Sequence, residues 1–221
     1  MGFQIAIDGP AGAGKSTVAK LAASALGFVY VDTGAMYRAA ALYMDERNID
    51  MEDDQAMEEA VRSAHIALEP DKDGQRVMLE GEDVTEKIRT EKAGMLASRV
   101  SACGGVRRSL VKMQQAIAAG QDVVMDGRDI GTVVLPDAPL KIYLTASVEA
   151  RAERRLKELR EKGLEPDPAK IREDIEQRDR QDMNRKESPL RQAEDAVYLD
   201  TSDMSIGEAV GRVLELYEER K

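Results

Sequence analysis

Eight residues near the amino terminus have the types and spacing that phosphate chemistry requires. Residues 9–16 read GPAGAGKS and match the pattern G-x-x-x-x-G-K-[ST]. The three glycines would let bare backbone N–H groups curl around anionic oxygens at a helix N-terminus. Lys15 would reach the β- and γ-phosphates, and the hydroxyl of Ser16 would ligate Mg²⁺. We therefore expect this loop to bind ATP or GTP.

The flanks of the loop favour phosphate binding over a chance match. An apolar run at residues 3–7 precedes it and predicts a strand, and residues 17–26 follow with a helical pattern. Strand, glycine loop and helix is the order in which this pattern binds phosphates. The predicted donor-nucleotide residues are Gly9, Pro10, Ala11, Gly12, Ala13, Gly14, Lys15, Ser16 and Thr17.

Other reactive residue types are scarce, which excludes several classes of enzyme. The chain has one histidine, His65, and one cysteine, Cys103. We expect His65 to lie in a strand and Cys103 to be a small packed residue. A histidine-based catalytic triad, a zinc cage and an internal disulfide are therefore excluded.

Arginine is the residue type that can answer a second phosphate, because its planar fork of donors suits phosphate oxygens. The candidates near strand ends and in a charged region are Arg38, Arg107, Arg128, Arg151, Arg154, Arg155, Arg178 and Arg185. On a helix, Arg151, Arg154 and Arg155 share one face and repel unless anions pair with them. This favours a lid that faces a nucleotide, and a solvated face balanced by nearby glutamates is the alternative.

Arg178, Asp182 and Arg185 follow at helical spacing and also fall on one face. An exposed ion pair between residues four apart is the simpler interpretation of Arg178 and Asp182. Residues 163–168 contain glycine and proline, and they divide the charged region at 151–191 into two predicted helices. That layout suits a mobile flap.

Composition indicates a folded enzyme of ordinary size. The 221 residues are 43% hydrophobic and 33% charged, with a net charge of −10. One α/β domain accommodates this length, and no apolar run approaches the roughly 20 residues that span a bilayer. An acidic chain does not suit general nucleic-acid binding, so anionic substrates must meet local positive clusters. With the first strand beginning at Phe3, no signal peptide is expected, and the predicted location is the cytoplasm.

Apolar runs alternate with helix-length segments, which is the rhythm of a parallel α/β sheet. The predicted strands are 3–7, 28–31, 123–125, 140–144 and 197–199, and the predicted helices are 15–26, 35–47, 106–119 and 148–162 with a last helix near the C-terminus. Ser205 and Glu208 form a capping box for that last helix. Residues 66–79 predict a β-hairpin that turns at 71–74 and interrupts the rhythm.

Four further segments give the chain its specific resemblance. They are VDTGAMYR at 31–38, GEDVTEKIRT at 81–90, DGRDIGTVVLPDAPLKIYL at 126–144 and RDRQDMNR at 178–185. Together with the glycine loop, and in this order and spacing, the chain resembles bacterial cytidylate kinases over nearly its whole length. The resemblance implies an α/β nucleoside-monophosphate-kinase fold with a five-stranded parallel core sheet flanked by helices. It implies a core of about 1–48, 91–150 and 192–221, a monophosphate-binding insertion of about 49–90 and a lid of about 151–191.

The resemblance also implies roles for individual residues. It places Arg38, Arg128 and Arg185 around the acceptor phosphate, Ser98, Arg107 and Asp129 at the cytosine, and Arg178 and Asp182 at the sugar. Asp32, Thr33 and Tyr37 match further substrate-binding positions, while Lys15, Arg128, Arg151 and Arg155 match the catalytic cations. Relatives can carry serine at positions 11 and 33, so any side-chain hydrogen bond at Ala11 is lost here, whereas Thr33 keeps its hydroxyl.

The implied reaction is transfer of the γ-phosphoryl group of ATP, with Mg²⁺, to CMP or dCMP. A carboxylate such as Asp129 or a hydroxyl such as Ser98 can prefer the N4 amino donor of cytosine to O4 of uracil. The acceptor phosphate is largely dianionic near neutral pH, since its second pKa is about 6, so no general base is needed. Catalysis then reduces to alignment and neutralisation of charge.

Alternatives of two kinds stay open. The acceptor could be UMP, AMP or a small metabolite such as shikimate. The chain could instead be a nucleotide-binding switch, although the guanine-reading NKxD is missing and its nearest match, NRKE at 184–187, has the wrong chemistry. We expect a monomer that acts on small molecules, with neither nucleic acid nor membrane as partner.

Overall fold

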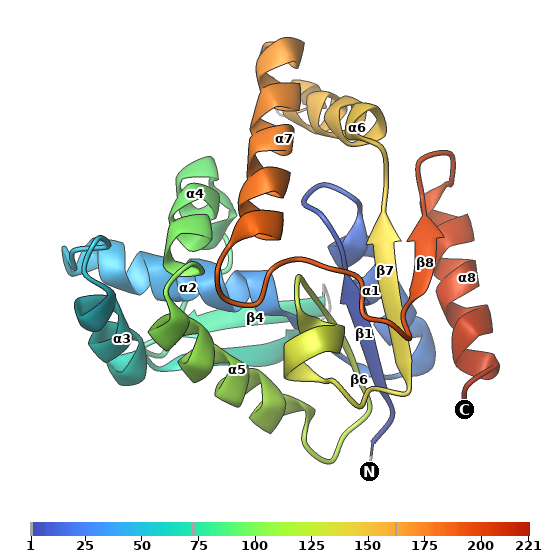
Figure 1. The fold of residues 1–221 in the computed structure, drawn as a ribbon, viewed down its shortest axis with the longest axis horizontal. Helices are drawn as coiled ribbons and strands as arrows, with labels where there is room; N and C mark the ends of the chain where they lie inside the picture. The colour runs from blue at the N-terminus through green and yellow to red at the C-terminus, as the bar shows by residue number, and fades with distance from the viewer. Residues whose placement is uncertain (1, 72–73, 162) are drawn as a thin grey trace.

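Five parallel strands form the sheet that carries the glycine loop, in the order β2-β6-β1-β7-β8. The computed structural model describes residues 2–71, 74–161 and 163–221. The strands of this sheet are β1 (Gln4–Asp8), β2 (Val29–Asp32), β6 (Val123–Gly127), β7 (Leu140–Thr145) and β8 (Val197–Asp200). The carboxyl ends of β7 and β8 point toward the top of the molecule in Figure 1, and both termini lie at the opposite end. The predicted five-stranded parallel sheet is confirmed.

Apolar residues bury both faces of this sheet, as parallel sheets require. Ile5 and Ile7 of β1 pack in one cluster with helices α1 (Lys15–Leu26) and α8 (Ile206–Glu218). Ala6 faces the other way, in a cluster with Met125 and the helical turn η2 (Ile130–Val134). Alternation along the strand thus produces two core layers from a single apolar run.

Helix α1 starts directly after the glycine loop and ends where predicted, at a left-handed Gly27. Gly9 is required by its surroundings, because a Cβ there would lie 1.9 Å from the carbonyl oxygen of Leu144. Its φ of 151° also favours glycine. The loop therefore passes tightly against the carboxyl end of β7 before α1 begins.

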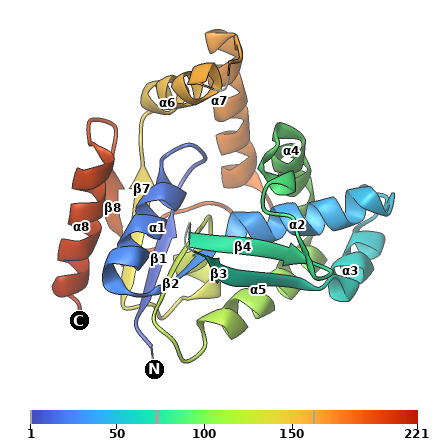
Figure 2. The same cartoon turned by 180° about the vertical axis from the view of Figure 1, so that it is seen from behind.

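The chain between β2 and β6 forms a separate layer beside the main sheet (Figures 1 and 2). Its elements are α2 (Thr33–Glu46), α3 (Asp54–Ser63), β3 (Ile66–Asp71), β4 (Gly74–Leu79), β5 (Glu82–Asp83), η1 (Lys87–Arg89), α4 (Glu91–Val100) and α5 (Gly104–Ala118). Strands β3, β4 and β5 form a small antiparallel sheet. Met36, Met44 and Val61 anchor the apolar core of this layer.

The predicted hairpin is confirmed, with Ile66 opposite Leu79 and Asp71 opposite Gly74. Positions 72 and 73 of the predicted turn lie outside the described residues. His65 lies directly before β3 rather than within it, so its strand assignment was wrong by one residue. Helices α3 and α4 were not predicted, although Asp53 and Thr90 cap them through side-chain hydrogen bonds. The cysteine prediction is confirmed, since Cys103 is buried in the core of this layer.

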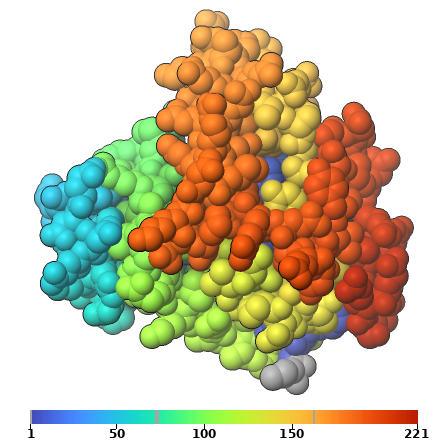
Figure 3. All heavy atoms as spheres, viewed as in Figure 1, coloured from blue at the N-terminus to red at the C-terminus, as the bar shows by residue number. Residues whose placement is uncertain are grey.

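Two helices stand above the sheet as a hairpin, α6 (Val148–Glu161) and α7 (Pro168–Asn184), as Figures 1 and 2 show. Lys162, at the end of the first predicted helix, lies outside the described residues. In Figure 3, α7 and the segment after it cross the face of the molecule between the small layer and the main sheet. The capping box of α8 is confirmed, with reciprocal hydrogen bonds between Ser205 and Glu208.

Candidate active site

The glycine loop closes on itself through Lys15. Its Nζ donates to the carbonyl oxygen of Pro10 at 2.7 Å, and the residue is only 5% exposed. Burial lowers the pKa of Lys15, and the charge of Arg128 lowers it further. An anion placed in the loop would favour the charged lysine, so the side chain is poised to meet phosphate.

Asp126 joins the loop to the end of β6. One carboxylate oxygen accepts from Ser16 Oγ at 2.8 Å and the other from Tyr30 Oη at 2.9 Å. Burial raises the pKa of Asp126, and the nearby Asp32 raises it further. Thr33 donates its hydroxyl to the Asp126 carbonyl oxygen at 2.8 Å. A hydroxyl and a carboxylate side by side at a phosphate loop are oxygen ligands of the kind Mg²⁺ prefers.

Sequence reasoning missed Asp126 as a site residue. A signal was present, because the carboxylate directly follows the buried run 123–125 and so lies at the carboxyl end of a parallel strand. Among the described residues, no three histidine, cysteine, aspartate or glutamate side chains gather to hold a metal ion. A metal here would depend on Ser16, Asp126 and phosphate oxygens together.

The predicted acceptor residues converge beside the loop, and they are already paired with carboxylates. Arg38 bonds to Asp32 at 2.9 Å, Arg107 to Asp129 at 2.5 Å and Arg128 to Asp182 at 2.7 Å. Arg185 Nε donates to the Ser188 carbonyl oxygen at 2.6 Å, and Arg185 Nη2 lies 3.9 Å from Asp129 Oδ1. Asp182 therefore pairs across the fold with Arg128, and the local pairing with Arg178 considered from spacing is not the contact it makes.

Several buried donors in this cluster have no hydrogen-bond partner within the described part of the chain. They are Tyr37 Oη, Arg38 Nε, Arg107 Nε and Arg185 Nη2. Burial lowers the pKa of Arg178 and of Arg185, and the neighbouring charges of Arg128 and Arg107, respectively, lower it further. Buried, mutually repelling cations with unused donors form a site that an anion would stabilise.

Two arginines of α6 touch the glycine loop. Arg151 donates to the Ala11 carbonyl oxygen at 3.1 Å and forms a two-pronged ion pair with Asp179 of α7, at 3.0 and 2.6 Å. Arg154 donates to the Ala13 and Thr201 carbonyl oxygens. Arg155 instead pairs with Glu158 on its own helix at 2.9 Å. The fold thus brings Arg151 and Arg154 to the loop, whereas Arg155 points along the surface of α6.

Ser98 lies on α4, half-buried, and its hydroxyl donates to Gln181 of α7 at 3.5 Å. Helix α7 and the small layer therefore meet beside the predicted base-reading residues. The remaining predicted loop residue, Thr17, is exposed on the first turn of α1.

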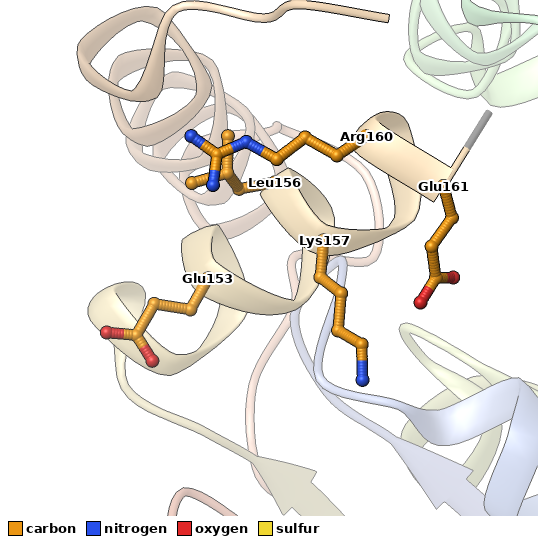
Figure 4. Close-up of a pocket in the computed structure, with 5 residues that line it drawn as sticks. All are labelled: Glu153, Leu156, Lys157, Arg160 and Glu161. Carbon is orange, nitrogen blue, oxygen red and sulfur yellow. The ribbon is translucent and has the colours of Figure 1, made fainter. Parts of the chain in front are cut away.

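A hollow on α6 lies apart from this cluster. Figure 4 shows its lining side chains, which all come from α6: Glu153, Leu156, Lys157, Arg160 and Glu161. A depression lined by one helix offers a ligand contacts on one side only, so it is not a candidate active site. No helix among the described residues is both long and apolar enough to cross a membrane.

Comparison with known proteins gives one consistent family. The family described as cytidylate kinase matches residues 5–219. A cytidylate kinase of Caldicellulosiruptor bescii is 52% identical over 215 residues, which cover 97% of this chain and 95% of the relative. A cytidylate kinase of Thermotoga maritima is 49% identical over 220 residues, covering 100% of this chain and 99% of the relative.

A solved structure shares the fold at low sequence identity. The crystal structure of an uncharacterized protein from Eubacterium ventriosum matches with a TM-score of 0.54 and 12% identity, covering 100% of both chains. At this identity the match describes chain topology alone.

Proposed function

The chain belongs to the cytidylate kinase family, an ATP-dependent group of nucleoside monophosphate kinases that phosphorylate CMP, and we propose from this premise that it converts CMP or dCMP by direct in-line transfer. The products are ADP and CDP or dCDP. One observation carries the proposal: a phosphate loop and a cluster of buried arginines with unused donors lie at the same edge of the sheet.

On the donor side, the backbone N–H groups of the loop and Lys15 hold the phosphates of ATP. Ser16 and Asp126 would hold Mg²⁺, since their own oxygens lie 2.8 Å apart at the end of the loop. When bound, this ion supplies positive charge that offsets the charge of the transferring group. Arg151 and Arg154 contact the loop from α6, and they stabilise the negative charge of the transferring phosphoryl group.

On the acceptor side, Arg38, Arg128 and Arg185 hold the monophosphate. Further substrate contacts come from Tyr37, Thr33 and Asp32. Asp32 caps α2 at Ala35 and bonds to Arg38, so the arginine is oriented before substrate arrives. Arg178 and Asp182 bind the sugar. Ser98, Arg107 and Asp129 read the cytosine, and the buried Arg107–Asp129 pair fixes the direction of both side chains.

The mechanism uses no general base. The acceptor phosphate arrives largely as a dianion, so its oxygen can attack without losing a proton. Arg128 pairs with Asp182, and its charge also lowers the pKa of Lys15, so it links the donor and acceptor halves. The residues about 49–90 form the monophosphate-binding insertion, and those about 151–191 form a lid whose closure excludes water as a competing acceptor. All of these groups come from one chain, so a monomer suffices.

A coupled assay of ADP release across acceptors tests the proposal. CMP and dCMP should drive ADP release, with UMP and AMP weaker and shikimate at the background rate seen without an acceptor. ADP release that does not depend on any monophosphate would contradict the proposal and favour a slowly hydrolysing switch.

A further inference from the structure

A buried carboxylate at the start of the glycine loop has no role in the mechanism above. Asp8 ends β1, directly before Gly9, and is 5% exposed. Its two oxygens accept hydrogen bonds from the backbone N–H groups of Ile130 and Gly131, each at 2.7 Å. These donors are 122 and 123 positions away in the sequence, so the contact depends on β6 lying beside β1.

The two anchored peptide groups directly follow Asp129. Asp129 itself adopts φ −144° and ψ 27°, and its carbonyl oxygen accepts from Val133 and Val134 as the turn η2 begins. The side chain of Asp129 is thereby directed toward Arg107, and Arg185 lies near its other oxygen. Asp8 therefore anchors the two peptide groups that follow Asp129, the residue proposed to meet the base.

Asp8 also lies between the two halves of the active site. Burial raises the pKa of Asp8 to about 6, against the lowering effect of the two backbone hydrogen bonds, and the charges of Asp129 and Lys15 both act on it. A Cβ on Gly131 would lie 3.4 Å from the Asp8 carboxylate and 3.1 Å from the Lys141 side chain, so Gly131 lies close to both side chains. The donor loop and the base-reading segment are thus joined through one side chain.

We propose that Asp8 is a positioning residue for base selection, which fixes the backbone of residues 129–131 against the glycine loop so that Asp129 meets the amino group of cytosine. The inference rests on the proposed function. Asp8 acts through Asp129 and touches neither nucleotide.

The variant Asp8→Asn removes one of the two acceptors while keeping the shape of the side chain. Its amide oxygen can accept one N–H, but its NH₂ group then faces the other N–H with no acceptor between them. The segment must rotate or leave a donor unpaired. A misplacement of about 1 Å can cost on the order of a hundredfold in rate, so we expect the CMP to UMP ratio of kcat/KM to fall by about tenfold or more. The KM for ATP should change by less than about threefold, because the loop keeps its own hydrogen bonds.

Asp122→Asn is the matched control. Asp122 accepts the backbone N–H of Phe3 at 2.6 Å and joins the same two strands at their amino ends, away from the site. It should leave the CMP to UMP ratio unchanged. Thermal unfolding of both variants reports any loss of stability separately from selectivity.

A double-mutant comparison distinguishes positioning from a general structural role. If Asp8 acts through Asp129, adding Asp8→Asn to Asp129→Ala should lower the CMP to UMP ratio no further than Asp129→Ala alone. The proposal would be overturned if the double variant lost selectivity by the product of the two single effects. An unchanged CMP to UMP ratio in folded Asp8→Asn would also overturn it. If Asp8→Asn does not fold, Asp8→Ala, which leaves space for a water to accept both N–H groups, is measured in its place. Failure of both to fold would also overturn it, because Asp8 would then serve the whole fold.

The same experiment separates this inference from the function on which it rests. A wild-type protein without preference for CMP, or an Asp129→Ala variant with an unchanged ratio, would contradict the base-reading assignment itself. A selective wild type and a less selective Asp129→Ala variant, together with an unaffected Asp8→Asn variant, would contradict the role of Asp8 alone.

Discussion

At the scale of residues, the site is organised by the choice of ionic partners. The arginines of the candidate site bond to carboxylates on other parts of the fold, as in the pairs Arg128–Asp182 and Arg107–Asp129. These pairs hold the guanidinium planes in place but leave other donors unused. A cation site that is oriented yet unsaturated is what an incoming phosphate needs, because little reorganisation remains at the moment of binding.

Lys15→Ala should lower turnover by orders of magnitude while CMP binding changes little. Lys15 lies in the donor loop and meets the phosphates of ATP in the proposed mechanism, so its loss removes stabilisation of the transferring group. Steady-state kinetics give turnover, and calorimetric titration gives CMP affinity. A variant with near-normal turnover would refute this role of Lys15.

Asp8 makes a prediction about stability and pH. Its carboxyl pKa is about 6 in the folded protein against 3.8 for the unfolded chain, so the folded state holds the proton more tightly. The stability of the wild type relative to Asp8→Asn should therefore rise as pH falls from 6 toward 4. The difference approaches about 3 kcal/mol below the unfolded pKa and is lost as pH rises through 6.

Urea unfolding of both proteins at several pH values between 4.5 and 7 measures this difference. The comparison with Asp8→Asn cancels the titration of carboxylates that lie far from Asp8. A difference that is constant over this range would show that Asp8 does not carry a raised pKa.

At the scale of elements, helix α6 decides which lid arginines face the loop. Three arginines at 151, 154 and 155 share a face by spacing, but the tilt of α6 over the loop brings Arg151 and Arg154 inward. Arg155, with a side chain 39% exposed, pairs with Glu158 one turn along. Helical spacing predicts which residues are neighbours on a face, whereas docking of the helix decides which of them reach the site.

Arg151→Ala should therefore lower kcat far more than Arg155→Ala does. An arginine that follows charge on a transferring phosphoryl group is worth on the order of a thousandfold in kcat, whereas an exposed pair contributes little. Parallel measurement of kcat and of unfolding free energy in the two variants separates catalysis from the loss of the buried pair with Asp179. Equal effects on kcat would support Arg155, as well as Arg151, as a catalytic residue.

At the scale of the whole molecule, a net charge of −10 coexists with a cluster of cations at one edge of the sheet. That edge is bordered by the main sheet, by the small layer with its own apolar core, and by the lid hairpin. Ser98 and Gln181 make a contact between the last two. The small layer and the main sheet have separate apolar cores, and we propose that the small layer and the hairpin of α6 and α7 close on substrates while the sheet keeps its shape.

Hydrogen exchange should resolve this division. With CMP and a nonhydrolysable ATP analogue together, backbone amides of α6, α7 and α4 should exchange more slowly, and those of β1 and β6 should not change. Either nucleotide alone should protect less of the lid. Equal protection over the sheet and the lid would indicate general stabilisation by ligand in place of closure.

The amino-acid sequence by itself determined the features that depend on near neighbours. The glycine loop, the ends of α1, the hairpin of β3 and β4 and the capping box at Ser205 could all be predicted, because each follows from spacing within a few residues. The resemblance of the quoted motifs also identified the family. Helices α3 and α4 were not predicted, since their caps are short signals inside a polar stretch. The start of α5 was missed because the helix begins with two glycines and its N-cap residue, Cys103, makes no side-chain capping hydrogen bond.

Only the tertiary structure decided which distant groups meet. Asp126 accepts a hydrogen bond from the Ser16 hydroxyl, and Asp8 accepts hydrogen bonds from the backbone of Ile130 and Gly131. Asp182 forms an ion pair with Arg128. Many pairings of these carboxylates and donors are compatible with the same composition. The order of strands in the sheet selects one, because β6 beside β1 brings the carboxyl ends of both strands together across more than a hundred residues.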